Sequence, residues 1–463
     1  MFPSIKLTHS ALAAGTLVLA ATAHADFSAA MKDYNAGRFD TARTQFLSLA
    51  ELGDCSSQFN LGAMALKGQG GTADRGAGVG WLEASLSNGC RQLVGERLPA
   101  LQAALTPEQR SAAEAIVARY SHDALQAQGA VNPNFECQAV TPAGVRDAAT
   151  PEYTRQKGGS NPDGIVIAAL TIGVDGHARD PQVLVSVPQD VFTAAAVEAW
   201  LNSHFQPATR AGVPIESRLL LKQRFVGNSG NLARSPAYEP ALPAAEAGEP
   251  AAQYLVGLTA TLEPALGVVA ARGGNMLIDS ARAGDADAQY WVAVQLRAAA
   301  ACRPQTSWRL WLRHAAEGGS AAAAADYAAE LLRGSPSAEQ LGEARTLLQR
   351  AAASKDYYAR KHAVALLAAS PVETVRDPKL ARSAAETLVH ANEIQSDPQM
   401  FEVLAAAYAS SNEYGNAVEA QRKAIQKALS LGWTTSLMEE RLATYRHDAP
   451  WVGDLYAAVP GQH

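Results

Sequence analysis

The sequence has few aromatic residues, few cysteines and no block of basic residues. Of its 463 residues, 6% are aromatic and 18% are charged, and the formal net charge is −6. A low aromatic content in an alanine-rich chain favours helices over a large β-sandwich. A mild negative charge without a basic cluster argues against nucleic acid as a partner. The length allows about two to four domains.

Sequence motifs of common catalytic and cofactor sites are also missing. The glycine-rich stretch 68–80 has no predicted strand before it and no Lys-Ser/Thr after it, so it predicts an inter-helix loop rather than a phosphate-binding loop. The histidines are scattered without an HExxH pair, and there is no G-x-S-x-G elbow. Trp308 and Trp311 lie three residues apart, a spacing that predicts core or groove lining rather than a cofactor contact. We therefore expect no enzyme activity, no cofactor and no metal, and an enzyme with a hidden site is the least favoured alternative.

Long hydrophobic runs are absent as well. A membrane-spanning helix needs about 20 apolar residues, and no stretch of the sequence reaches that length. The N-terminus instead has Lys6, an apolar stretch at 11–23 that Ser, Thr and Gly interrupt, and an A-x-A-type cleavage site that ends at Ala25. This pattern predicts a signal peptide over residues 1–25 and a mature chain that begins at Asp26, without a membrane span, in an oxidising space. The alternative is an uncleaved anchor.

The four cysteines, Cys55, Cys90, Cys137 and Cys302, form no C-x-x-C pair, which argues against a zinc or thioredoxin-type site. In an oxidising compartment we expect at least two of them to form a structural disulfide. Four cysteines allow three pairings, and the sequence does not choose among them. Cys55–Cys90 or Cys90–Cys137 would each connect parts of the N-terminal region.

A phrase that recurs at a fixed interval dominates the rest of the chain. Gly-Glu-Pro-Ala-Ala-Gln-Tyr at 248–254 is echoed by Gly-Asp-Ala-Asp-Ala-Gln-Tyr at 284–290, and weaker echoes begin at Gly319 and Lys355. Intervals of about 36 residues are typical of helical solenoids, in which each helix pair buries its apolar face against its neighbours. The phrase resembles Sel1-like repeats, as does the N-terminal region, and residues 404–425 resemble a tetratricopeptide hairpin. The resemblance implies concave surfaces that bind peptides or proteins.

Residues 151–225 have strand patterns in place of the helical repeats. The run 164–172 is too apolar and β-branched for a surface helix and predicts a strand. Asp175-Gly176 predicts the turn that closes it, and residues 183–187 predict a second strand.

A helix and a third strand are expected to complete this unit. Apolar residues at helical spacing predict an amphipathic helix from about residue 191 to residue 205, which Pro207 would end. Residues 218–225 predict a strand with its charges placed as on an exposed edge.

This order of residues resembles the C-terminal domain of TonB-family energy transducers. One departure is Thr154, which stands where the family usually has proline. The matching positions, which cover about a sixth of the chain, are Pro151, Tyr153, Gly164, Val166, Ile172, Asp175, Gly176, Phe192, Ala195, Phe205, Pro207, Ala208, Gly212, Pro214 and Phe225.

The resemblance implies that the terminal strand pairs with an extended segment of a partner by β-augmentation. We therefore predict Arg218, Leu220, Lys222 and Arg224 as partner-binding residues, the partner being a protein or extended peptide such as an outer-membrane receptor. The alternative is that neighbouring repeats or a second copy of the chain cover this edge. TonB-type transducers also carry an inner-membrane helix and a Pro-rich spacer, and here a Sel1-like region stands in the place of that spacer.

The predicted fold class is mainly α, with two α-solenoid regions on either side of a small α+β TonB-like domain. We expect a periplasmic protein-interaction protein, either a TonB-type transducer or accessory, or an envelope assembly scaffold. The predicted divisions are a signal peptide (1–25), N-terminal Sel1-like repeats (26–128), a linker (129–150), the TonB-like domain (151–227), a linker (228–247), Sel1-like repeats (248–370) and a tetratricopeptide-like region (371–463).

Overall fold

The computed structural model describes residues 26–128, 140–152, 162–236, 238–263, 270–299, 307–391 and 394–456. Within these ranges the chain is mainly helical, and all of the strands lie between residues 140 and 225. The predicted signal peptide (1–25), Tyr153, Thr154, Cys137 and Cys302 lie outside the described residues. No helix within the described ranges combines the length and the apolar content needed to cross a bilayer.

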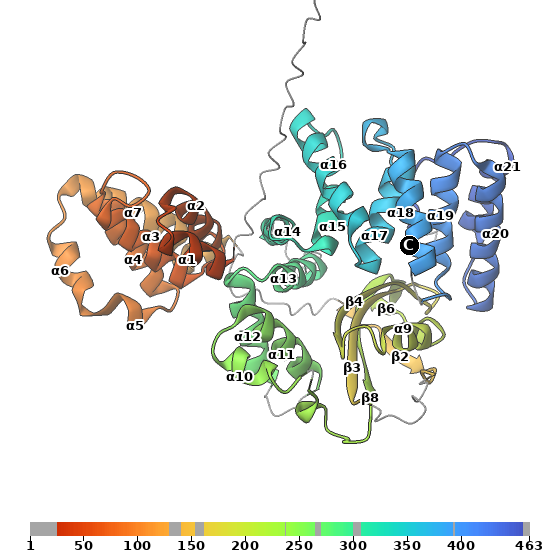
Figure 1. Cartoon of the computed structure of the whole chain (residues 1–463), viewed down its shortest axis with the longest axis horizontal. Helices are drawn as coiled ribbons and strands as arrows, with labels where there is room; N and C mark the ends of the chain where they lie inside the picture. The colour runs from red at the N-terminus through yellow and green to blue at the C-terminus, as the bar shows by residue number, and fades with distance from the viewer. Residues whose placement is uncertain are drawn as a thin grey trace, which may run out of the picture.

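Helices α1 to α8 precede the strands, and α10 to α21 follow them (Figure 1). The first group comprises α1 (Phe27–Asn35), α2 (Phe39–Ala50), α3 (Cys55–Lys67), α4 (Arg75–Ser87), α5 (Arg91–Val94), α6 (Leu98–Ala103), α7 (Pro107–Tyr120) and α8 (His122–Ala127). The second group comprises α10 (Ala241–Glu246), α11 (Pro250–Leu262), α12 (Ala270–Arg282), α13 (Ala286–Ala299), α14 (Ser307–Glu317), α15 (Ala321–Leu331), α16 (Ala338–Ala353), α17 (Tyr357–Ala369), α18 (Pro378–Ala391), α19 (Pro398–Ser410), α20 (Tyr414–Ser430) and α21 (Ser436–Arg446).

The repeated glycine-containing phrase marks the place where one helix ends and the next begins. Gly284 has a φ of 100°, a conformation that glycine adopts without strain at the end of α12. The next residue, Asp285, accepts the N–H of Ala288 at 2.8 Å and so caps the start of α13. Helices α11, α13, α15 and α17 each begin two residues after an echo of the phrase, and each of them packs against the helix that follows it.

Gln289, the glutamine of the second copy of the phrase, makes the same bond as Gln58 in the N-terminal region. Gln58 Nε2 donates to the Ala50 carbonyl at 3.1 Å, and Gln289 Nε2 donates to the Ala281 carbonyl at 3.0 Å. Both side chains are buried, so each bond satisfies a polar group that would be costly to leave unpaired.

The glycine-rich stretch 68–80 is a loop only in its first half. Gly76, Gly78 and Gly80 lie inside α4, so the expectation of an inter-helix loop is wrong for this part. A Cβ on Gly78 would lie 2.6 Å from Leu66 Cγ, and one on Gly62 would lie 3.0 Å from the Gly78 carbonyl oxygen. These glycines therefore allow α3 and α4 to pack with their backbones close together.

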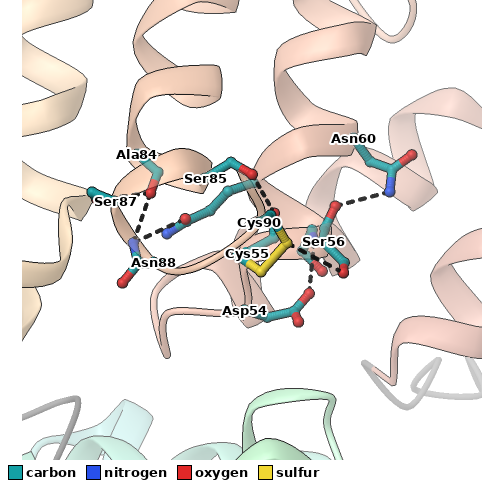
Figure 2. Close-up of a disulfide and its surroundings, with 11 residues drawn as sticks. Asp54, Cys55, Ser56, Asn60, Ala84, Ser85, Ser87, Asn88 and Cys90 are labelled. Atoms are coloured by element: carbon teal, nitrogen blue, oxygen red, sulfur yellow. Dashed lines mark hydrogen bonds between the residues drawn. A yellow bond between two sulfur atoms is a disulfide. The ribbon is translucent and has the colours of Figure 1, made fainter. Parts of the chain in front are cut away.

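A disulfide joins Cys55, at the start of α3, to Cys90, which directly precedes α5. This is one of the two pairings considered for the N-terminal region. Figure 2 shows its surroundings, in which Ser85 Oγ donates to the Cys55 carbonyl at 2.8 Å and Asn88 Nδ2 donates to the Ala84 carbonyl at 3.0 Å. The bridge thus closes the end of α4 onto the beginning of α3.

The N-terminal helices form a separate lobe that touches the later helices through α1 and α2 (Figure 1). The Phe27 N–H donates to the Ala283 carbonyl at 3.1 Å, and Ser48 Oγ lies 3.0 Å from His314 Nδ1 on α14. Glu51 lies 3.8 Å from Arg313 on the same helix. The junction is therefore polar at its rim, while Leu52 is buried in the same apolar cluster as residues of the later helices.

The strands form one three-stranded antiparallel sheet, in the order β4-β3-β8, and two smaller sheets, β1-β6-β7 and β2-β5. Register between β3 and β8 runs from Gly164 opposite Phe225 to Ile172 opposite Ser217. The strand bounds are β1 (Val140–Thr141), β2 (Gly144–Asp147), β3 (Gly164–Ile172), β4 (Ala178–Val187), β5 (His204–Gln206), β6 (Ala208–Arg210), β7 (Val213–Ile215) and β8 (Ser217–Phe225).

Strand β3 is apolar except for Thr171 because both faces of its sheet are covered. One face packs on α9 (Thr193–Leu201), where Val166 and Leu170 join Trp200 in one buried cluster. On the other face, Ile165 and Ile167 belong to the cluster that extends through the later helices. In Figure 1 the sheet accordingly lies between α9 and the helices that follow it.

The predicted boundaries of this region need three corrections. The helix predicted to reach residue 205 ends at Leu201, and Phe205 instead lies in β5, which pairs with β2. The second strand is longer than the predicted 183–187, since β4 begins at Ala178. The predicted linker 129–150 contributes β1 and β2, whose partners β6 and β5 lie inside the predicted domain.

Candidate functional site: the β8 edge and the cleft beside it

Strand β8 lies at one edge of its sheet. Among the described residues its one strand partner is β3, so the backbone groups on its other side have no strand to pair with. The strand follows the short β7 after a single residue, and its apolar residues Leu221 and Phe225 pack toward α9. An edge of this kind can accept a further strand.

The four predicted partner-binding residues alternate along β8 and therefore share one face of the strand. That face is turned toward the helices that follow the sheet in the chain, and the opposite face is turned toward α9. Arg218 Nη2 donates to Gln182 Oε1 at 2.8 Å, and Leu220 packs against the large apolar cluster. Lys222 Nζ donates to Glu263 Oε2 at 2.8 Å, and Arg224 Nη2 donates to the Gly230 carbonyl at 3.0 Å.

These side chains are thus engaged within the chain, so any role in partner binding would fall first on the backbone edge. Sequence reasoning had placed the charges of Arg218, Lys222 and Arg224 on an exposed surface. It could not foresee their intramolecular partners, because Gln182 lies on β4, beyond β3 in the sheet, and Glu263 lies at the end of α11.

A buried charge cluster that the sequence did not reveal joins β4 to α17. Asp180 on β4 lies 3.1 Å from Lys361 Nζ and 2.8 Å from His362 Nε2, both on α17. Lys361 is fully buried and also contacts Asp397, itself fully buried, at 3.0 Å. Arg218 completes the group, with Nη1 3.2 Å from Asp180 Oδ2. A buried lysine requires such partners, because an isolated buried charge is very costly.

The pKa values of the cluster follow from these contacts. Burial by itself raises the pKa of the Asp180 carboxyl, but the charges of His362, Lys361 and Arg218 outweigh it and hold that pKa well below its usual range. Burial lowers the pKa of Lys361, yet the charges of Asp397 and Asp180 reverse the effect and raise it. Asp180 and Lys361 therefore remain charged, and their contact ties the sheet to the helices.

Tyrosines extend this polar junction. The hydroxyls of Tyr290 and Tyr358 donate to the two oxygens of Asp326 at 3.0 and 2.9 Å. The His362 ring stacks on Tyr456 with 4.4 Å between ring centroids. Burial raises the pKa of all three tyrosines well above the ordinary value, so their hydroxyls stay protonated and act as donors.

A cleft of about 950 Å³ opens at this junction. One wall consists of the start of β8, the short strands beside it and parts of β3 and β4. The other wall consists of α13, α15, α17 and the residues after α21. Its size suits a small molecule or a peptide segment. No group of three or more His, Cys, Asp or Glu side chains within the described ranges is arranged to hold a metal ion.

Comparison with known proteins identifies the strand region. Residues 149–226 match the family model of the Gram-negative bacterial TonB protein C-terminal, a span that includes β3, β4, α9 and β5 to β8. None of the curated proteins compared with the chain matches it. The match supports a TonB C-terminal-like domain in this part of the chain, a kind of domain that interacts with protein partners in the Gram-negative envelope.

Proposed function

We propose that the chain is a periplasmic, non-enzymatic interaction protein whose TonB-like domain adds an extended segment of an outer-membrane transport partner to the open edge of β8. The observation that carries the proposal is that β8, the last strand of the matched region, pairs with β3 alone among the described residues. Main-chain hydrogen bonds to that edge would supply much of the affinity.

The remaining parts of the proposal concern export and the helices. Residues 1–25 act as a cleaved signal peptide, so N-terminal sequencing of the mature protein should begin at Asp26. The helices on either side of the strands form Sel1-like and tetratricopeptide-like solenoid regions. The recurring helix starts and the equivalent bonds of Gln58 and Gln289 support this reading.

A second candidate is an envelope assembly scaffold without a role in energy transduction. The buried contacts of Asp180 with Lys361 and His362 favour it, because they hold the TonB-like domain against α17. A domain fixed in this way could present its edge as one part of a larger docking surface.

Crosslinking in intact cells separates the two candidates. A photo-reactive amino acid in place of Gln223 on β8 should capture an integral outer-membrane transport protein. The same substitution at Arg110, an exposed residue on α7, serves as the control and should not capture it. Capture of periplasmic or cell-wall assembly proteins alone would favour the scaffold and contradict the transport partner.

A further inference from the structure

The cleft beside β8 follows the backbone edge of the strand. The first three residues of β8, 217–219, line it, as do Glu216 and Ile215 directly before them. Successive side chains on a strand point to opposite faces, so Arg218 and Leu219 place the cleft at both faces of β8 around its open edge. The cleft also extends over the helix-facing side of the sheet, to Thr171 on β3 and to Asp180 and Gln182 on β4. A segment added to the start of β8 would therefore lie inside this cleft.

The opposite wall is built from one face each of three helices. Tyr290 and Arg297 lie on α13 at helical spacing. Asp326 lies on α15, and Arg333 lies two residues beyond the end of α15. Tyr358 and His362 contribute from α17. Alternate side chains of an added strand would point at this wall.

The charge that the α13 and α15 part of the wall exposes is positive. The side chains of Arg297 and Arg333 are 51% and 67% exposed, whereas those of Asp326 and Glu330 beside them are 11% exposed. Arg297 Nη1 lies 3.7 Å from Asp326 Oδ2, beyond hydrogen-bond distance. Asp326 is occupied by two tyrosine hydroxyls, so the Arg297 guanidinium keeps donors for another acceptor.

Other charged residues of the cleft offset part of this positive charge. Arg333 Nε lies 3.1 Å from Glu330 Oε2, but the Arg333 side chain remains 67% exposed. On the strand side Arg210 and Glu216 are both exposed and carry opposite charges. Asp454 is exposed beside Tyr456, and its carboxylate accepts the Tyr456 N–H at 2.8 Å. The negative charge of Asp454 thus belongs to the α17 side of the cleft rather than to the wall of α13 and α15.

We infer that the wall formed by α13 and α15 selects the partner: the extended segment that adds to β8 carries acidic side chains, which bind Arg297 and Arg333. This inference rests on the proposed strand addition at β8. It assigns to the helices, which lie outside the matched TonB-like region, the task of recognising the partner's side chains. Arginine suits the task because its planar guanidinium binds carboxylates through two parallel hydrogen bonds.

Two labelled octapeptides test the inference on the purified mature chain by fluorescence anisotropy. Acetyl-(Thr-Glu)4 places all of its carboxylates on one face of an extended strand, and acetyl-(Thr-Lys)4 is its basic counterpart. The acidic peptide should bind roughly tenfold more tightly at low salt, and this preference should shrink at high salt. Arg297→Gln with Arg333→Gln should remove most of the preference, while the control Arg110→Gln should retain it.

Equal binding of the two peptides, binding of neither, or a preference unchanged in the double variant would overturn the inference. An acidic peptide with N-methyl groups on alternate backbone nitrogens separates it from the proposed function. If N-methylation abolishes binding and the double variant changes nothing, strand addition stands and recognition by the arginines fails. If N-methylation has no effect while the double variant loses the preference, the arginines bind acidic peptides but strand addition at β8 fails.

Discussion

Asp180 is the residue through which the sheet is joined to the helices. It stands on β4 with a positive φ of 51°, a conformation that is unfavourable for most residues other than glycine. Its carboxylate contacts side chains from two elements, Lys361 and His362 on α17 and Arg218 on β8. Strained backbone of this kind persists where the surrounding contacts fix it.

Replacing Asp180 with Asn should destabilise the fold by about 2–4 kcal/mol, because it leaves buried cations without their counter-charge. The measurement is urea unfolding followed by circular dichroism at pH 7. Asp147→Asn is the matched control, since Asp147 forms an ion pair in which both side chains are about two-thirds exposed. That control should change stability by less than about 1 kcal/mol.

The same variant has a pH signature. The folded pKa of Asp180 lies below the unfolded value of about 3.9, so its stabilising contribution is fully present above about pH 4 and is lost as the pH falls below it. The stability gap between wild type and Asp180→Asn should therefore narrow below pH 4. A gap that is absent at pH 7, or that widens in acid, would show that the carboxylate charge does not hold the junction.

His314 provides a second residue-scale prediction, at the junction of the N-terminal lobe. Burial, aided by the charge of Arg313, lowers its pKa to about 4, so the folded state favours the neutral ring. Stability from this residue is present above the unfolded pKa of about 6.5 and is lost as the pH falls toward 4. His314→Gln cannot titrate and can still hydrogen bond to Ser48.

The stability of wild type relative to His314→Gln should fall by about 2–3 kcal/mol between pH 7 and pH 4.5. Thermal and urea unfolding at both pH values would measure it. Asp54 and Asp285, whose pKa values burial raises to about 6, titrate in both proteins and cancel in the difference. A difference that stays constant across this range would refute the buried neutral imidazole.

At the scale of single elements, local sequence signals predicted the structure well where they were strong. Strand β3 has the predicted bounds 164–172, because an apolar β-branched run buried on both faces leaves few alternatives. The recurring phrase predicted repeated helix pairs, and the structure adds the reason for one helix start, the cap that Asp285 forms on α13. Strands β1, β2, β5, β6 and β7 are two to four residues long, too short for an alternating pattern to mark them.

The candidate site was harder to predict than the elements. The position of the edge strand β8 could be predicted from its sequence, but the buried charged cluster around Asp180 could not. Lys361 sits in the helical sequence Tyr-Tyr-Ala-Arg-Lys-His-Ala-Val-Ala-Leu-Leu, where a lysine usually extends into solvent. Its partners Asp180 and Asp397 lie on different elements, and such a buried contact becomes visible only when the fold brings the three together.

The disulfide is an element-scale feature with a measurable contribution. It closes a loop with a sequence separation of 35 residues between α3 and α5. Replacing Cys55 and Cys90 together with serine should lower the stability of the N-terminal lobe by about 3–4 kcal/mol, mainly through the larger entropy of the unfolded chain. Urea unfolding with and without reductant gives the test. A wild-type midpoint that reductant leaves unchanged would contradict a structural role.

At the scale of the whole molecule, the TonB-like domain stands between two helical regions in the sequence, whereas in space the later helices lie between it and the N-terminal lobe (Figure 1). The later helices form one wall of the cleft beside the edge strand. The sheet contributes the backbone edge, and the helices contribute tyrosine and arginine side chains. The central claim is that an extended segment of a partner adds to this edge.

Partner capture by three variants of β8 tests that claim most directly. Lys222→Ala removes a side chain that is 39% exposed and should keep most of the capture. Proline removes a backbone N–H, and adjacent N–H groups of a strand point to opposite sides, so one of Lys222→Pro and Gln223→Pro removes a donor at the open edge.

Capture from intact cells is scored beside the circular dichroism spectrum of each purified variant. The account predicts that Lys222→Ala retains capture and that the proline variant at the open edge loses it while its helical and sheet signals remain. Retention of capture by every proline variant that remains folded would contradict strand addition at β8.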